Sequence, residues 1–406
     1  MVDLKNDLSK IREQFPVLDK CVYLISNSLG AVPKSTQTEL MNYYKLWANE
    51  GVNAWKKEWW GLSKNIASKL ESFLKAEKQS ISMMPNATIS HWVALSTKFN
   101  APHRNRGKII VTELDFPSSI YAVSKIAEFM RWKIETVRSE NSVTLEPEKI
   151  IRKIDRSTLF IITSHVCFKS GFIQDIHAIA KKARTVGAVT VIDGYHAPGS
   201  IPVNLKESGV DFYIGGCLKW LCGGPGNAFL YTRSGFASKA TPSLTGWLAH
   251  KNPFAFDLQM KYTTGPYRYM SGTPPIPSLY TASAGLNIIQ DIGIKTIREK
   301  SIFMTEMIIN KAQERKFAIH SPLNQKIRGG AVSLNLPSAF QVKQALENRK
   351  TYVDFRKGKT RKQDVIRIGP HFYNEEKEIS ALFDQIDQIY SSGEYKKYSD
   401  QIKHVT

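Results

Sequence analysis

The sequence predicts an α/β protein in which a mainly parallel sheet is followed by a smaller α+β domain. Short apolar runs alternate with segments of helical periodicity from residue 107 to about residue 231. Polar or charged side chains stand directly after several of these runs. Beyond residue 236 the pattern changes to loop-like stretches, one long helical region and shorter alternating elements. Strands that alternate with helices of about 10–15 residues are typical of βαβ units and therefore of a parallel sheet.

The length of the chain indicates more than one domain. With 406 residues, it exceeds the size of an ordinary single hydrophobic core. We expect an N-terminal arm over residues 1–30 that packs with the small domain. The large domain is expected over residues 31–276 and the small C-terminal domain over residues 277–406.

Composition and charge narrow the function classes. Apolar residues make up 42% and charged residues 23%, which is ordinary for a globular protein. No apolar run approaches the roughly 20 residues that span a bilayer, and the N-terminus lacks a basic-then-apolar signal peptide. A net charge of +20 could indicate nucleic-acid binding, but the lysines are scattered and aromatic or apolar residues interrupt the basic run at 349–362. We expect a cytoplasmic protein with a lysine-rich surface that binds neither nucleic acid nor membrane; attraction of anionic substrates is a weaker account of the charge.

The cysteines predict free thiols and no metal site. Of Cys21, Cys167, Cys217 and Cys222, only the last two are close in sequence. Their spacing without histidine partners is a poor zinc pattern. Reduced thiols in a cytoplasm fit this usage best.

The N-terminal part contains helices and two polar loops. Residues 1–20 are expected to form a short helix and an arm, and a polar loop over 23–30 leads to a helix over 33–50. Asn86 or Thr88 can cap a further helix that runs to about residue 98. Such a helix start is also able to bind an anion, because free backbone N–H groups point outward, although capping alone explains these residues.

The alternating region supplies the predicted sheet. Strands are expected at 108–112, 132–137, 159–163, 189–193, 212–214 and 228–231. Helices are expected from about 117 to 131, at 146–154 and at 173–185. In the C-terminal part we expect a helical region over 277–315, strands at 331–336, 352–355 and 365–369, and helices at 341–349 and 376–390.

Chemically useful side chains follow the predicted strand ends. In sheets of this kind ligands bind beyond the carboxyl ends of the strands. The residues expected to converge there are Phe116, Cys167, Asp193, His196 and Lys219. This convergence is the strongest physical indication of a site in the sequence.

Lys219 and Asp193 suggest a particular chemistry. A lysine among large apolar residues is unusual because its charged form is costly to desolvate, although its tip can also reach water. Lys219 and Asp193 could form a simple buried ion pair. They are also the pair that pyridoxal phosphate needs, since a lysine holds the cofactor as a Schiff base and a carboxylate keeps its pyridine nitrogen protonated.

Motifs along most of the chain carry a resemblance to a known family. They are YLISNSLG at 23–30, DFPSSIY at 115–121, SHVCFKSGFIQDI at 164–176, DGYH at 193–196, GGCLKWLCGGPG at 215–226, GW at 246–247, PFAFD at 253–257, SGTPP at 271–275 and RIGPHFYN at 367–374. With these motifs the chain resembles the class V aminotransferase family of fold-type-I pyridoxal-phosphate enzymes, and within it the kynureninase branch. The motifs are specific for the family and much less specific for the reaction.

The resemblance implies roles for the cofactor site. Lys219 would be the Schiff-base lysine and move protons on the substrate, while Asp193 would pair with the pyridine nitrogen. His196 would lie near the phenolic oxygen of the cofactor, and Phe116 would stack over its ring. The phosphate would be held by Asn86, Ala87 and Thr88, and by Gly272 and Thr273 of the other subunit.

The resemblance also implies a substrate site and an assembly. Arg367 would bind the α-carboxylate of an amino-acid substrate as a bidentate clamp. Trp247 would reach the pocket across a homodimer whose active sites lie at the subunit interface. Asn27 and Cys167 are further candidates for substrate contacts, although Cys167 can also be read as a small buried apolar residue.

Departures from the family pattern bear on the reaction. Kynureninases typically carry a tyrosine directly before the lysine, where this chain has Leu218, and an aspartate at the position of Ser119. No cysteine follows Cys222, as desulfuration through a persulfide would require. We therefore expect an amino-acid enzyme with transamination or Cβ lyase and elimination chemistry. Kynureninase-like cleavage of kynurenine to anthranilate and alanine is the alternative, and a non-catalytic basic scaffold or RNA-associated relative is a remote one.

Overall fold

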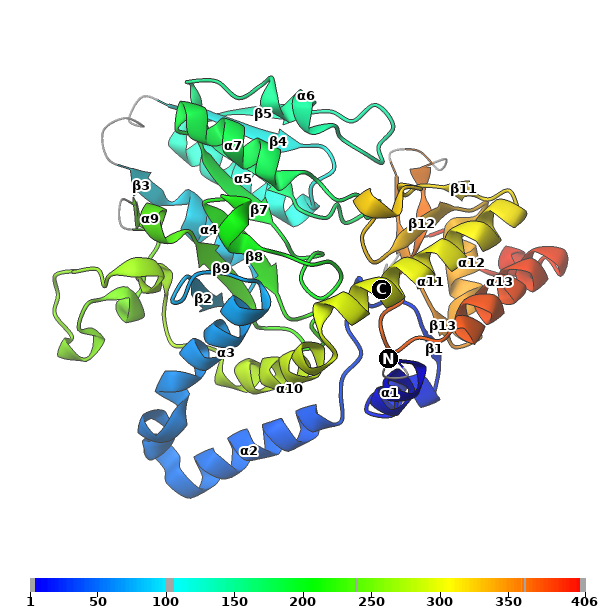
Figure 1. Ribbon diagram of the computed structural model, residues 1–406, viewed down its shortest axis with the longest axis horizontal. Helices are drawn as coiled ribbons and strands as arrows, with labels where there is room; N and C mark the ends of the chain where they lie inside the picture. Colours follow the sequence, from blue (N-terminus) through cyan, green and yellow to red (C-terminus); the bar gives the residue numbers. More distant parts are fainter. Residues whose placement is uncertain (1–3, 100–105, 238–239, 359, 361–362, 402–406) are drawn as a thin grey trace.

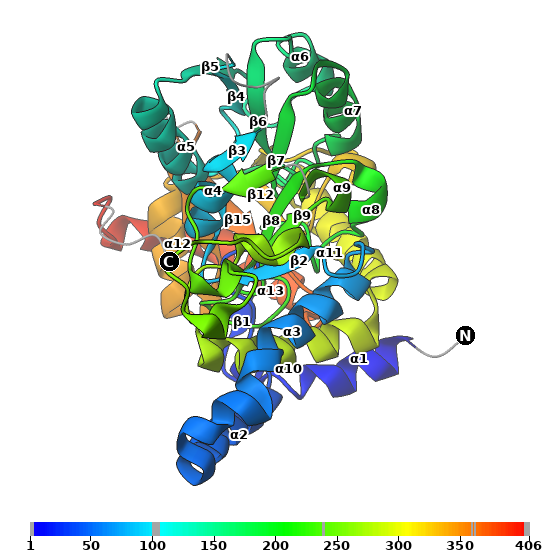
Figure 2. The same ribbon diagram turned by 90° about the vertical axis from the view of Figure 1, so that its left-hand side faces the viewer.

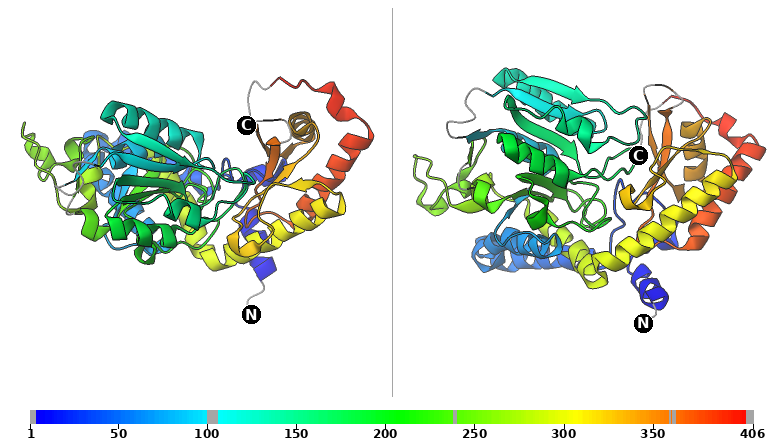
Figure 3. Two further views of the ribbon diagram at one scale, coloured as in Figure 1. Left: turned by 90° about the horizontal axis from the view of Figure 1, so that it is seen from above. Right: turned by 45° about the horizontal axis from the view of Figure 1, so that its top comes forward.

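The chain folds into a large and a small lobe that lie side by side (Figures 1 and 3). The computed structural model describes residues 4–99, 106–237, 240–358, 360 and 363–401. The large lobe contains a seven-stranded sheet with its covering helices, and the small lobe contains a four-stranded sheet. Among the described residues, none of the helices combines the length and apolar character that a membrane crossing requires.

The seven-stranded sheet is mainly parallel, which confirms the predicted fold class. Its strand order is β2-β9-β8-β7-β6-β4-β5, with β4 to β8 parallel to one another and β9 antiparallel to both of its neighbours. The strands are β2 (Ile81–Met84), β4 (Lys108–Thr112), β5 (Lys133–Val137), β6 (Thr158–Ser164), β7 (Val189–Asp193), β8 (Phe212–Gly216) and β9 (Ala228–Thr232). Strand β2 is not among the strands predicted from the sequence.

Helices cover both faces of this sheet (Figure 2). Alternate residues of a strand face opposite sides, so Ile109 packs with α4 and α5, whereas Ile110 packs with α6 and α7 on the other face. The helices of the large lobe are α2 (Ser35–Glu50), α3 (Trp60–Phe73), α4 (Ala87–Leu95), α5 (Pro117–Met130), α6 (Pro147–Ile151), α7 (Ile176–Val186), α8 (Leu205–Ser208) and α9 (Ser234–Ala237). A small antiparallel pair, β3 (Thr97–Phe99) with β10 (Ala240–Pro242), follows α4, which ends earlier than predicted.

Two successive helices connect the lobes. The predicted helical region over 277–315 is divided into α10 (Ile276–Ile292) and α11 (Ile294–Glu314) at Gly293, whose φ of +80° lies in the left-handed region. The predicted boundary at residue 277 falls just inside α10, whose buried residues share a core with α2 and α3. Helix α11 packs in the small lobe.

The small lobe is an antiparallel sheet covered by helices. Its strand order is β11-β12-β15-β14, and its core is formed with α11, α12 and α13. The elements are β11 (Ala318–Ile319), β12 (Val332–Asn335), β14 (Asp354–Arg356), β15 (Val365–Ile368), α12 (Ala339–Asn348) and α13 (Glu376–Ser391).

The N-terminal segment contacts the small lobe. Helix α1 (Leu4–Arg12) places Arg12 against Glu378 at 3.1 Å, and β1 (Val22–Tyr23) pairs in parallel with β13 (Thr351–Tyr352). This pairing explains why the strand predicted over 352–355 is observed as two pieces. Strand β13 pairs with the N-terminal segment and β14 pairs with β15.

Candidate active site

A cavity of about 200 Å³ lies at the carboxyl ends of β6, β7 and β8. The starts of α4 and α5 complete its wall. Its lining residues are Ala87, Thr88, His91, Phe116, Ser118, Ser119, Ser164, Val166, Phe168, Asp193, Tyr195, His196, Leu218 and Lys219. The predicted crevice at the strand ends therefore exists, and it contains Phe116, Asp193, His196 and Lys219.

Lys219 follows β8 and places its amine beside a histidine and two aromatic rings. Nζ lies 2.6 Å from His196 Nε2, 5.0 Å from the ring centre of Tyr195 and 5.8 Å from that of Phe116. Burial, followed by the positive charge of Arg367, lowers the pKa of Lys219 to about 7. Burial, followed by the charge of Lys219, holds the pKa of His196 well below its usual range. A substantial fraction of this amine is therefore neutral and nucleophilic at neutral pH.

Three backbone contacts hold the turn that carries Lys219. The Gly30 N–H donates to Leu218 O at 3.0 Å, and the Cys222 N–H donates to Lys219 O at 3.1 Å. From the small lobe, His371 Nε2 donates to Trp220 O at 2.8 Å. A Cβ at residue 30 would lie only 2.1 Å from Lys219 O, so glycine is needed for this approach. The position of the amine thus depends on the N-terminal segment and on both lobes.

Asp193 ends β7 with its carboxylate partly satisfied. Oδ2 accepts from Ser119 Oγ at 2.7 Å, and Oδ1 accepts from the Tyr195 N–H at 3.0 Å. The side chain is buried and lines the cavity. These bonds fix its orientation, because each carboxylate oxygen has one directed donor.

The start of α4 forms another wall of the cavity. Asn86 caps the helix, since its Oδ1 accepts from the Ile89 N–H at 2.9 Å. Ala87 and Thr88 line the cavity, and Thr88 Oγ1 lies 2.9 Å from Ser118 Oγ. The first turn of a helix with a polar hydroxyl beside it is suited to an anion such as phosphate.

Arg367 lies on β15 and contacts Phe168, which lines the cavity. Its guanidinium is buried and donates to Phe168 O in the large lobe and to the Asp354 carboxylate on β14. The Asn27 amide completes the group: with its oxygen toward Arg367, it accepts from Nε and Nη2, both at 3.3 Å. Arg356 donates to the other oxygen of Asp354 at 2.6 Å. Asp354 therefore neutralises one of two adjacent cationic groups, and one positive charge remains in this group.

Seven predicted site residues lie outside the cavity lining, namely Asn27, Asn86, Cys167, Trp247, Gly272, Thr273 and Arg367. Cys167 packs in an apolar cluster with Ile110 and Phe172, and burial raises the pKa of its thiol well above the usual value. Trp247 contacts Trp60 and other aromatic rings. Gly272 and Thr273 are exposed.

Comparison with known proteins identifies the family. The sequence model of the class V aminotransferases matches residues 22–382, which is most of the chain. The chain belongs to the class V aminotransferase family. This result confirms the resemblance found in the sequence motifs.

Proteins similar to this class V aminotransferase chain include a kynureninase and two enzymes with solved structures. A kynureninase from Geobacillus thermodenitrificans is 29% identical over 98% of the chain and 95% of its own length. The structure is similar to the apo structure of a cysteine desulfurase from Thermococcus onnurineus, with a TM-score of 0.83, 22% identity and coverage of 94% and 98% of the two chains. It is also similar to a cystine C–S lyase, with a TM-score of 0.82, 19% identity and coverage of 92% and 99%. At these identities the structural matches establish the fold alone.

Class V aminotransferases are pyridoxal-phosphate enzymes, and this chain is one of them. The residues of the cavity fit the cofactor. They include an amine of lowered pKa, a buried carboxylate, an aromatic ring and a helix start, and all of these lie around one space. These are the groups that an aldehyde, a pyridine nitrogen, a flat ring and a phosphate require.

Sequence reasoning missed several residues of this class V site. Ser119 was noted only for the aspartate it replaces, yet it donates to Asp193. Tyr195 stands inside the quoted DGYH motif, and its position two residues after Asp193 was the available signal. Asp354 gave no signal, because its pairing with Arg367 depends on the register of β14 and β15.

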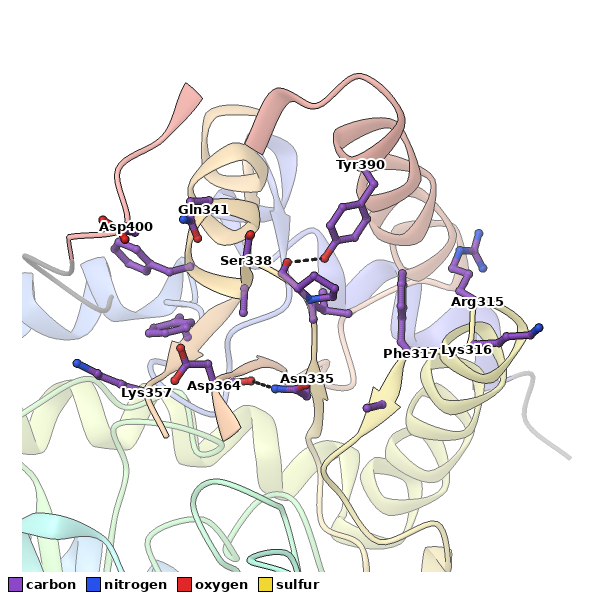
Figure 4. A pocket seen from close by; sticks show the side chains of 16 residues that line it. Arg315, Lys316, Phe317, Asn335, Ser338, Gln341, Lys357, Asp364, Tyr390 and Asp400 are labelled. Atoms are coloured by element: carbon purple, nitrogen blue, oxygen red, sulfur yellow. Dashed lines mark hydrogen bonds between the residues drawn. The ribbon is translucent and has the colours of Figure 1, made fainter. Parts of the chain in front are cut away.

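A larger cavity of about 790 Å³ lies in the small lobe, away from this site (Figure 4). It lies beside the end of α11, the start of α12 and α13. Figure 4 shows Tyr390 donating to Pro337 O at 2.8 Å on one side, and Lys357 and Asp364 on another. The cavity is not lined by Phe116, Asp193, His196 or Lys219, so its size does not make it the candidate active site.

Proposed function

We propose that this class V enzyme uses pyridoxal phosphate to transform a small amino acid, by lyase or elimination chemistry at Cβ or by transamination. The observation that carries the proposal is the meeting of Lys219, Asp193 and Phe116 in one cavity. Lyase-type chemistry is supported by the kynureninase relatives. Transamination begins with the same activation of Cα and stays open.

Each wall of the cavity has a proposed role toward the cofactor. Lys219 would hold it covalently, and Asp193 would bind its pyridine nitrogen. When bound, the cofactor supplies an electron sink for bonds at the substrate Cα. Its ring would face Phe116, and its phosphate would be held by Ala87 and Thr88 at the start of α4, with Asn86 contributing as the helix cap.

Lys219 and His196 are the proposed proton-handling groups. The lowered pKa of Lys219 lets its amine accept a proton at neutral pH, and His196 Nε2 lies within hydrogen-bond distance of it. Leu218, which lines the cavity beside Lys219, can neither donate nor accept a proton. The acid–base work near the amine is therefore assigned to Lys219 and His196.

Arg367 is proposed as the group that binds the substrate α-carboxylate. The group formed by Arg367, Arg356 and Asp354 retains one positive charge, which matches one carboxylate. Asn27 would orient the guanidinium through its amide. Cys167 is less suited to a substrate contact, since its side chain packs in the apolar cluster.

Kynureninase-type hydrolysis is the second candidate, favoured by relatives such as the enzyme from Geobacillus thermodenitrificans. Two departures oppose it. Leu218 offers no acid beside Lys219, and Ser119 is engaged with Asp193. A residual hydrolysis far slower than another reaction of the same chain would agree with both observations.

A screen of amino acids distinguishes these reactions. The holoenzyme is mixed with kynurenine, cysteine, cystine and a set of simple amino acids with and without a keto acid, while cofactor absorbance is followed and products are identified. Release of pyruvate or sulfide indicates elimination, and anthranilate with alanine indicates the kynureninase reaction. A chain that neither binds pyridoxal phosphate nor changes its absorbance with any substrate would overturn the proposal.

We also infer a homodimer with shared active sites. Helix α2 exposes a row of apolar side chains, namely Leu40, Met41, Tyr44 and Trp47, which are 39–62% exposed. An exposed row of this kind is typical of a protein interface. Trp247, Gly272 and Thr273 lie outside the cavity of their own chain, so they are free to contribute to that of a partner.

Light scattering after size-exclusion chromatography tests the dimer. Replacing Tyr44 with Glu places a charge in the exposed row and is expected to produce monomers with weaker cofactor binding. The matched control is Tyr121→Glu on α5, whose side chain is 69% exposed outside this row. A wild-type chain that is monomeric at micromolar concentration would contradict the inference.

A further inference from the structure

Tyr195 occupies a position at the end of β8 that a neighbouring side chain would otherwise fill. A Cβ built on Gly216 would lie 2.5 Å from the Tyr195 hydroxyl and 2.6 Å from the adjoining ring carbons. Only glycine at residue 216 leaves room for the phenol. The phenol thus reaches from the end of β7 to the end of β8. Strand β8 ends at Gly216, which is three residues before Lys219.

The hydroxyl of Tyr195 lies beside Gly216 at the end of β8. Tyr195 lines the cavity, and its backbone N–H is bonded to Asp193. Within the described part of the chain, no hydrogen bond uses its hydroxyl. Burial, followed by Cys217 and Asp193, raises the pKa of this phenol, so it keeps its proton at neutral pH.

The arrangement around Lys219 indicates what this donor faces. On pyridoxal phosphate, the phenolic oxygen and the phosphate arm flank the carbon that a lysine attacks. His196 lies on one side of the Lys219 amine at 2.6 Å. The phosphate arm then belongs on the other side, toward Ala87 and Thr88 at the start of α4. Helix α4 packs against β8. The Tyr195 hydroxyl lies at the end of that strand, beside Gly216.

We propose that the Tyr195 hydroxyl donates a hydrogen bond to the phosphate group of the cofactor. This inference rests on the proposed function. The phenol supplies a directed donor where Gly216 has no side chain, and it adds to the backbone N–H groups of α4 and the Thr88 hydroxyl. A hydrogen bond to a charged phosphate is stronger than one between two neutral groups. Removal of the donor therefore has a measurable effect on the affinity for the cofactor.

Tyr195→Phe tests the proposal, because it removes one oxygen and keeps the ring that fills the space above Gly216. The full-length chain is freed of cofactor and titrated with pyridoxal phosphate and with pyridoxal, which lacks the phosphate. We expect roughly tenfold weaker binding of pyridoxal phosphate and unchanged binding of pyridoxal. The phosphorus NMR signal of bound cofactor should also shift relative to the wild-type holoenzyme.

The controls separate this proposal from the function on which it rests. Tyr121→Phe, on the exposed face of α5, should bind both compounds as the wild type does. Equal losses for pyridoxal and pyridoxal phosphate, or no loss for either, would overturn the role of Tyr195 while leaving the cofactor assignment intact. Failure of the wild-type chain itself to bind pyridoxal phosphate would instead overturn the proposed function. Thermal unfolding of the cofactor-free chains verifies that each variant is folded.

Discussion

The large-lobe and small-lobe halves of the site differ in whether their charged groups are already paired. On the large-lobe side, Lys219 and Asp193 project into the cavity, and the pKa of the amine is lowered to about 7 by burial and nearby cations. On the small-lobe side, Arg367 is already paired with Asp354, and Arg356 is paired with the same carboxylate. The first half leaves reactive groups available, and the second half neutralises one of its two positive charges before a substrate arrives.

This difference shows where each half depends on the fold. Neighbouring strand ends of one sheet position Lys219 and Asp193. The Arg367 group bridges the lobes, because its guanidinium donates both to Phe168 O and to Asp354. Changes in the first half should therefore alter chemistry, whereas changes in the second should alter substrate affinity and the relative placement of the lobes.

The largest expected effect is that of Lys219→Ala. Without the amine, the chain should lose covalent attachment of the cofactor and at least about 10²–10⁴-fold in turnover, the usual contribution of an acid–base group. Borohydride reduction followed by mass spectrometry should label the wild type and leave the variant unlabelled. The exposed control Lys125→Ala should be labelled normally. Labelling of Lys219→Ala at another lysine with retained turnover would contradict the assignment.

The next largest effect is expected for Asp193→Ala, which should preserve cofactor attachment and lower turnover. Removing one partner of a buried charged pair costs about 3 kcal/mol or more, which corresponds to roughly a hundredfold in rate. Borohydride labelling of Lys219 and single-turnover absorbance changes measure the two properties separately. Turnover close to that of the wild type would exclude a role for Asp193 at the pyridine nitrogen.

The sequence predicted the large-lobe half better than the small-lobe half, for a physical reason. Parallel strands bring their carboxyl ends together whatever their exact register, so Phe116, Asp193, His196 and Lys219 could be placed at one edge from the strand pattern alone. The Arg367 and Asp354 pair depends on antiparallel register, since these residues lie directly opposite each other on β14 and β15. The alternation of strands and helices alone does not specify that register.

Cys167 shows a limit of reasoning from strand ends. The expectation that it joins the crevice treated all residues after β6 alike. Side chains in an extended segment alternate between opposite sides. Val166 and Phe168 line the cavity, and Cys167 between them packs in the apolar cluster with Phe172.

Arg367→Gln tests the second half of the comparison. Loss of a charge-assisted contact should raise KM for the amino acid by about 10- to 100-fold, with cofactor affinity much less affected. The variant leaves the buried Asp354 with fewer partners, which should also lower stability. The double variant Arg367→Gln with Asp354→Asn should recover stability in thermal unfolding while KM stays high. Equal losses of cofactor and substrate binding would contradict the clamp role.

Ser119→Ala is expected to have a smaller effect than Arg367→Gln. It removes one of the hydrogen bonds to Asp193 and keeps that from the Tyr195 N–H, so kcat should fall by several-fold, up to about tenfold. Ser118→Ala is the matched comparison, because its hydroxyl contacts Thr88 and should influence cofactor affinity instead. A Ser119→Ala enzyme with unchanged kcat and weakened cofactor binding would contradict a role for Ser119 at the pyridine nitrogen through Asp193.

The smallest effect links the two halves through charge. Because the pKa of Lys219 is about 7, cofactor capture by the cofactor-free chain should accelerate as pH rises through 7 and then level, as the amine loses its proton. Arg367 and Arg356 both lower this pKa, and Arg367 is the larger cause. Removing either cation favours the protonated amine and moves the midpoint to higher pH. Stopped-flow absorbance across pH should therefore show a higher midpoint for Arg356→Gln than for the wild type, and a still higher one for Arg367→Gln. A midpoint that falls in either variant would refute the electrostatic link between the lobes.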